Sequence, residues 1–158
     1  MKYNNELKKA FQVSIPVMMG YSVLGFAFGL LLVSFEYSWY LAPLMSLFIY
    51  AGALQFVAIS FFNVKAGMID IAIASWFINI RQSFYGLSLL KRFKDTGKFK
   101  TYLIFSLTDE TYALLTTIKD DESLNKRWYY FFLTALNQSY WFIGSTLGAI
   151  IGSNIKFN

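Results

Sequence analysis

The sequence contains no cysteine and no histidine in its 158 residues. Without thiols or imidazoles, the chain has no disulfides, no thiolate nucleophile, no haem ligation through histidine and none of the usual zinc sites. A serine–histidine pair of the intramembrane-protease type is excluded for the same reason. We therefore predict neither a metal nor another cofactor.

Charge is also scarce, since charged side chains make up 15% of the chain and hydrophobic ones 56%. This composition is too apolar for an ordinary soluble domain. Uncharged runs cover residues 11–34, 41–62 and 128–155, and each is as long as the roughly 20 residues that cross a bilayer core. The first run is too long for the apolar part of a signal peptide and lacks a small-x-small cleavage site, so we expect it to be retained.

We therefore predict an all-α integral membrane protein, a bundle of about five hydrophobic segments in a single transmembrane domain over residues 1–158. Proline and glycine interrupt the first two segments, so we expect one or more segments to be broken or re-entrant. Such backbone is tolerated at membrane depth where it lines a cavity. The expected segments cover residues 11–34, 41–62, 68–90, 101–118 and 128–152.

The basic residues, which give a net charge of +5, sit in short clusters between apolar runs and are densest in residues 91–100. Cytoplasmic loops of membrane proteins carry such clusters, so the expected partner is the lipid bilayer and not nucleic acid. If all five segments cross, the basic residues nearly balance on the two sides. If one of the first three is broken or re-entrant, residues 1–10 and 91–100 share a side. We favour the second arrangement, and the orientation stays open.

Arg81 is the main candidate for a functional residue because it stands about halfway along the apolar segment 68–90. An arginine at that depth costs roughly 2.5–3.5 kcal/mol, so it requires protein or water around it and an anionic partner. Asp109 and Glu110, midway along the next apolar segment, are the obvious partners. Asp109 continues a polar stripe from Ser106, whereas Glu110 points about 100° away from it. We expect other polar side chains to lie beside the pair: Asn79, Gln82, Gln55, Tyr85 and Tyr112.

A buried cation beside a carboxylate suits a zwitterion, because a guanidinium grips a carboxylate and an acidic side chain holds an ammonium group. An aliphatic amino acid fits both the charges and the apolar surroundings, and Asp109 or Glu110 could carry a coupled proton. In the alternative, Arg81 and its partner neutralise each other in a non-transporting assembly subunit. An acid protease is not expected: Asp70 is the only other aspartate near an apolar segment, without a Gly-x-Gly-Asp context. The chain is thus not predicted to be an enzyme.

Glycines recur every fourth residue in the first and last segments. Small residues at this spacing let helices approach closely. In the first segment, the alternative is a broken helix whose free backbone groups bind substrate. We likewise expect Gln55 to hydrogen-bond between helices, and the alternative is that its amide contacts a bound ligand. The predicted packing residues are Gly25, Gly29, Gly52, Gly144, Gly148 and Gly152.

Several blocks occur in an order that resembles one known family. They are Gly-Phe-Ala-Phe-Gly (25–29), Ala-Gly-Ala-Leu-Gln-Phe (51–56), Asn-Ile-Arg-Gln-Ser-Phe-Tyr-Gly (79–86), Leu-Thr-Asp-Glu-Thr-Tyr-Ala (107–113), and Trp141 followed by Gly144 and Gly148. The chain resembles the AzlC family, the large subunit of bacterial branched-chain amino acid exporters.

The resemblance implies a multi-pass permease of the bacterial inner (plasma) membrane that exports leucine, isoleucine or valine with a small membrane subunit of the AzlD type. We expect export to be driven by the proton gradient. Two features depart from the family. Members commonly carry histidine where this chain has Gln82, so a proton role of that histidine cannot operate here. Members also run longer, with further hydrophobic segments after the last glycines, so we expect either a fragment or a shortened, C-terminally truncated member.

Overall fold

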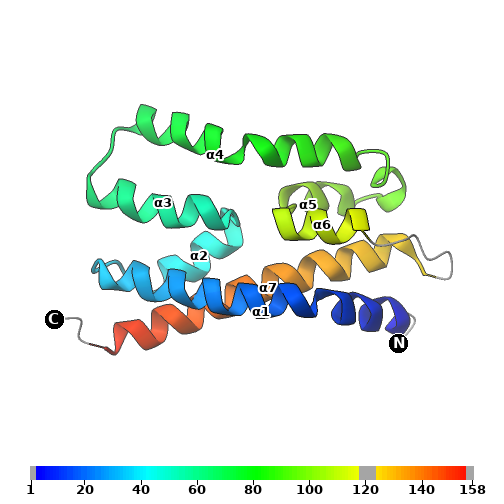
Figure 1. The fold of residues 1–158 in the computed structure, drawn as a ribbon, viewed down its shortest axis with the longest axis horizontal. Coiled ribbons are helices and arrows are strands. Elements are labelled where there is room, and N and C mark those ends of the chain that lie inside the picture. The colour runs from blue at the N-terminus through cyan, green and yellow to red at the C-terminus, as the bar shows by residue number, and fades with distance from the viewer. Residues whose placement is uncertain (1–2, 118–123, 156–158) are drawn as a thin grey trace. The chain divides into compact units, whose positions relative to one another are not determined.

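A computed structural model describes residues 3–117 and 124–155, and every regular element in these residues is a helix. This confirms the predicted all-α class for the described part of the chain. Figure 1 shows the order of the elements. They are α1 (Asn4–Ser34), α2 (Leu41–Phe48), α3 (Gly52–Asn63), α4 (Met68–Leu89), a short 3-10 helix η1 (Lys94–Thr96), α5 (Phe99–Phe105), α6 (Asp109–Thr117) and α7 (Lys126–Ser153).

The second expected segment is broken into α2 and α3. At the break, Tyr50 has a φ of 42°, and Ala51 is extended with φ −133°. A positive φ is uncommon for a bulky residue and does not continue a right-handed helix. The expectation of at least one broken segment therefore holds here. The first segment is different, because α1 continues through Pro16 without interruption.

The fourth expected segment is also two helices, which corrects the prediction of one polar stripe through Ser106 and Asp109. Helix α5 ends at Phe105, and α6 begins at Asp109. In the gap, the Ser106 hydroxyl donates to the Tyr102 carbonyl at 2.5 Å. The Thr108 hydroxyl oxygen accepts the Thr111 backbone N–H at 3.3 Å. Such side-chain bonds compete with helix continuation and favour a new helix start.

Among the described residues, α1 is the one helix that is both long and apolar enough to cross a membrane by length and composition. Helix α3 is apolar but shorter. The breaks explain why the segments 41–62 and 101–118 do not meet this criterion as single helices. The prediction that about five segments cross the membrane stays a prediction.

The chain divides into two compact units. Unit 1 comprises Met1–Met18 and Arg81–Asn137. It contains the start of α1, the second part of α4, η1, α5, α6 and the first part of α7. One apolar cluster joins all of these except η1, and its buried members are Ala10, Leu89, Phe93, Leu103, Leu107, Leu115, Tyr129, Tyr130 and Leu133. The expected single domain over residues 1–158 stays a prediction.

Unit 2 comprises Met19–Ile80 and Gln138–Asn158, and here the glycines of α1 and α7 face each other. A Cβ added at Gly25 would lie 3.0 Å from the Trp141 carbonyl oxygen, and one at Gly144 would lie 2.9 Å from the Ser22 carbonyl oxygen. At Gly29 and Gly148 the opposing backbone is closer still. The two helices touch through their backbones, which a side chain at these positions would prevent.

Two further predicted packing glycines also lie against neighbours in unit 2. A Cβ at Gly52 would lie 3.0 Å from the Trp141 ring, and one at Gly152 would meet the side chain of Val33 on α1. Sequence inspection could not name a partner for the glycines of the last segment. The structure provides α1 as that partner.

Candidate functional site

Arg81 and Asp109 form an ion pair within unit 1, between Nη1 of the arginine and Oδ2 of the aspartate. The pair joins α4 to the first residue of α6, a position where a carboxylate also interacts favourably with the helix dipole. The Arg81 side chain is 47% exposed and the Asp109 side chain 37%. The expected pairing of the arginine with an acid is present, and the described residues leave part of each side chain uncovered. The expectation that the pair is submerged in the membrane stays a prediction.

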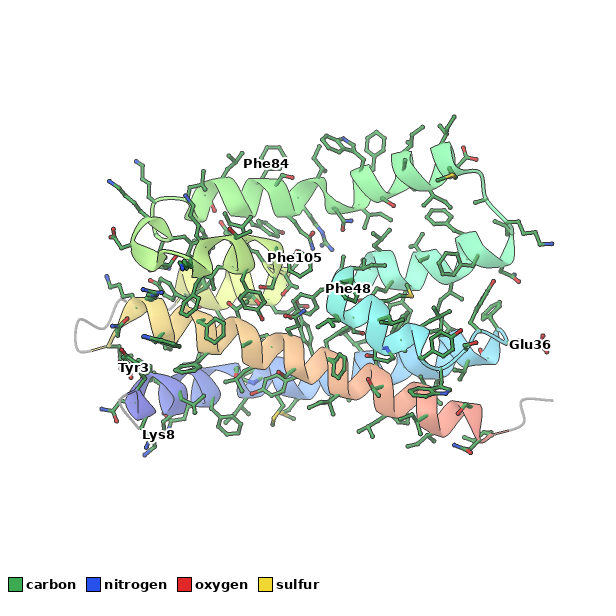
Figure 2. All side chains as sticks on the ribbon, turned by 180° about the vertical axis from the view of Figure 1, so that it is seen from behind. Tyr3, Lys8, Glu36, Phe48, Phe84 and Phe105 are labelled. Atoms are coloured by element: carbon green, nitrogen blue, oxygen red, sulfur yellow. The ribbon has the colours of Figure 1, made fainter. Side chains whose placement is uncertain are left out.

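The openness follows from the position of α4, whose buried residues are only Gly86 and Leu89. Figure 2 shows Phe84 pointing away from α5 and α6, and its side chain is 62% exposed. Glu110, the other candidate acid, is exposed on α6. Since Glu110 follows Asp109 by 100° of helix rotation, the two carboxylates point in different directions.

Two tyrosines continue the contact between α4 and α6 beside the ion pair. The rings of Tyr85 and Tyr112 stack with their centroids 4.3 Å apart and an interplanar angle of 15°. Tyr85 follows Arg81 by four residues, and Tyr112 follows Asp109 by three, so ring and charge share a face on each helix. The Ser88 hydroxyl donates to the Tyr112 hydroxyl at 3.3 Å. Charge and aromatic surface thus lie together, with Gln82 half-buried on the same helix.

The start of α6 is held by polar side chains that sequence analysis did not select. Thr108 caps the helix, and its hydroxyl donates to the Thr111 hydroxyl at 3.2 Å. Asn137 on α7 donates through Nδ2 to Thr111 Oγ1 at 3.0 Å, and both of these side chains are fully buried. A threonine just before the helix was the available signal, because it is a favoured capping residue. The contact with Asn137 had no signal in the sequence.

Gln55 lies in unit 2, in a buried polar chain that joins three helices. The Trp141 indole N–H donates to Gln55 Oε1 at 2.9 Å, and Gln55 Nε2 donates to Ser46 Oγ at 3.4 Å. The Ser46 and Ser145 hydroxyls lie 2.7 Å apart. These contacts connect α2, α3 and α7, which favours the reading of Gln55 as glue between helices. Asn79 is half-buried on the part of α4 in unit 2. The prediction that Gln55 and Asn79 adjoin Arg81 stays a prediction.

The chemistry available at the ion pair is the recognition of opposite charges. A guanidinium presents five N–H donors, and about half of the Arg81 side chain is open to a ligand. The other carboxylate oxygen of Asp109, Oδ1, is buried, and it has no hydrogen-bond partner among the residues that the structure describes. The guanidinium side of the pair can thus receive an anion.

Comparison with known proteins identifies close relatives. An uncharacterized membrane protein of Helicobacter pylori (strain ATCC 700392 / 26695) is 43% identical over 96% of the chain and 66% of its own length. The branched-chain amino acid transport protein AzlC of Bacillus subtilis (strain 168) is 36% identical over 96% of the chain and 59% of its own length. The inner membrane protein YgaZ of Escherichia coli (strain K12) is 30% identical over 90% and 59%.

The chain thus spans 59–66% of the length of these relatives. No solved structure matches it. The family model described as AzlC protein matches residues 16–155, a range that holds the Arg81–Asp109 pair and both sets of facing glycines. The chain therefore belongs to the AzlC family.

Proposed function

We propose that the chain is the permease part of a transporter that exports branched-chain amino acids across the bacterial inner membrane. The observation that carries the proposal is the partly uncovered Arg81–Asp109 ion pair. Family membership supports it, as does the name of the Bacillus subtilis relative, a branched-chain amino acid transport protein. In this proposal Arg81 holds the substrate carboxylate, and the stacked rings of Tyr85 and Tyr112 provide a wall for the aliphatic side chain.

The uncovered surface of the pair supports a binding role. The described residues leave 47% of the Arg81 side chain and 37% of the Asp109 side chain uncovered, so a ligand can reach both charges. A pair that only held two helices together would need no such access.

The same pair suggests how a proton would be coupled to transport. The chain has no histidine, so we assign the coupled proton to a carboxylate, Asp109 or Glu110; the steps are given for Asp109, which pairs with Arg81. Protonation of Asp109 would remove the charge that holds Arg81 and would free the guanidinium for the substrate carboxylate. Loss of the proton would restore the ion pair and expel the substrate. We include a small AzlD-type membrane subunit as the proposed partner, on the family resemblance alone.

The test is efflux of radiolabelled valine from preloaded cells that express the chain together with an AzlD-type subunit. In Arg81→Gln, efflux should fall about ten- to a hundredfold at unchanged protein level, because charged hydrogen bonds worth roughly 1.5–3 kcal/mol are lost. Arg81→Lys should retain part of the activity, since it keeps the charge but not the two-pronged geometry. Ser83→Ala, an exposed change on the same helix, is the matched control.

The outcomes separate the proposal from its alternative. Normal valine efflux in Arg81→Gln would remove Arg81 from the mechanism. If the substitution instead lowers the protein level, and the wild-type chain adds no efflux over cells without it, the non-transporting assembly subunit is the better account.

A further inference from the structure

One end of unit 1 gathers basic residues from three separate stretches of the chain. These are the start of α1, the connection from α4 to α5, and the start of α7, which Figure 1 shows at the same end of this unit. Figure 2 labels Tyr3 and Lys8 there. We call this surface the basic rim; its described members are Lys8, Lys9, Lys91, Arg92, Lys94, Lys98, Lys100, Lys126 and Arg127.

Direct contacts hold the three stretches together. The Asn125 backbone N–H donates to Glu6 Oε1 at 3.0 Å. The Tyr3 ring stacks on the Trp128 ring with centroids 4.8 Å apart. The Phe99 ring meets the Trp128 ring edge-on, with centroids 5.0 Å apart. The rim is therefore a surface of unit 1 that side-chain contacts between the three stretches hold together.

The exposed charge of the rim is strongly positive. Most of its basic side chains are exposed. Of the two acids in the described part of this end, Glu6 is only 8% exposed and already bonded to Asn125. The other, Asp95, is exposed. Residues 118–123 lie outside the described residues and add three acids and one lysine in sequence, which leaves the basic residues in excess.

The rim also coincides with the boundary between charged and uncharged sequence. The uncharged run of α1 begins after Lys9, and that of α7 begins after Arg127. Tyr3 and Trp128 lie at this boundary, each half-buried. Tryptophan and tyrosine prefer the depth of lipid headgroups, and long basic side chains extend outward from that depth.

We propose that the basic rim binds the headgroups of anionic phospholipids in the cytoplasmic leaflet. Lysines near an anionic membrane surface attract it as point charges, and Arg127 can hold a lipid phosphate with two N–H groups. Nucleic acid fits less well: the Trp128 ring is already engaged by Tyr3 and Phe99, and Arg127 lies over the Phe99 ring at 4.7 Å. These rings are in contact with one another and are not free to stack on bases. The inference does not depend on the proposed transport activity.

The test uses the purified full chain in a nonionic detergent and native mass spectrometry to measure bound lipid. Phosphatidylglycerol is the anionic probe, phosphatidylcholine the zwitterionic one, and inorganic phosphate represents a free anion. Lys94→Gln/Lys98→Gln removes two exposed charges without touching the apolar cluster. Its matched control is Lys94→Arg/Lys98→Arg, and Lys65→Gln changes charge in unit 2.

The wild-type chain should retain phosphatidylglycerol and little phosphatidylcholine. The double glutamine variant should bind phosphatidylglycerol about 25-fold more weakly at low ionic strength, from roughly fivefold for each lysine. The arginine pair and Lys65→Gln should match the wild type. Equal retention of the two lipids would overturn the proposal, and so would unchanged affinity in the double glutamine variant. Inorganic phosphate that binds as tightly as the lipid would also overturn it, in favour of a free-phosphate site.

Discussion

The close approach of α1 and α7 in unit 2 predicts a graded response to the smallest possible side-chain addition, glycine to alanine. A new Cβ meets nothing within 4 Å at Gly20, a carbonyl oxygen at 3.0 Å at Gly25, and backbone much closer than that at Gly29. All three positions lie in the same helix. The series therefore varies the steric conflict while the chemical change stays the same.

Two opposing effects determine each result. Alanine favours a helix interior over glycine by about 1 kcal/mol, whereas overpacking a tight contact costs roughly 1–3 kcal/mol and sometimes more. Gly20→Ala should therefore raise the free energy of unfolding by up to about 1 kcal/mol. Gly25→Ala should leave it nearly unchanged, because the two effects are similar in size. Gly29→Ala should lower it by about 1–3 kcal/mol, since backbone cannot move aside as a flexible side chain can.

The measurement is reversible unfolding of the purified chain by titration with sodium dodecyl sulfate, followed by helical circular dichroism. Gly148→Ala should resemble Gly29→Ala. In the double variant Gly29→Ala/Gly148→Ala, the loss of stability should be smaller than the sum of the two single losses. Helices that one methyl group has already pushed apart leave room for the second. The reasoning fails if Gly29→Ala is as stable as Gly20→Ala, or if the order of the three single variants is reversed.

Three further predictions follow from other contacts. Trp141→Phe keeps an aromatic ring but removes the N–H that donates to the buried Gln55 oxygen at 2.9 Å. It should lower the free energy of unfolding by about 1–3 kcal/mol in the same titration, and an unchanged midpoint would contradict this. Thr108→Ala removes the cap of α6 and should cost about 1 kcal/mol, with faster amide hydrogen exchange confined to the first turn of that helix. The chain has no native cysteine, so the variants Lys8→Cys and Lys98→Cys, both on the basic rim, report which side of the membrane the rim faces. An impermeant maleimide should label both only after cells are opened. Labelling of either one in intact cells would reject the shared cytoplasmic face.

Properties set by a residue and its near neighbours were readable from the sequence. The long uncharged runs and the scarcity of charge identified a membrane protein family, because an uncharged run of the length that crosses a bilayer can be read directly from the sequence. The ordered blocks around Arg81 and Asp109 identified the AzlC family. The need of Arg81 for an acidic partner also followed from its position in an apolar segment.

Only the tertiary structure decided which acid pairs with Arg81, which helix carries that acid and how much of the pair is left uncovered. Asp109 pairs with Arg81 because the chain breaks before it and starts a new helix there, and that break depends on capping bonds of Thr108 that periodicity does not reveal. The glycines of α7 predicted a close contact without naming α1 as the partner. Spacing along one helix shows which side chains share a face, but the element that covers this face is chosen by packing between residues far apart in the chain.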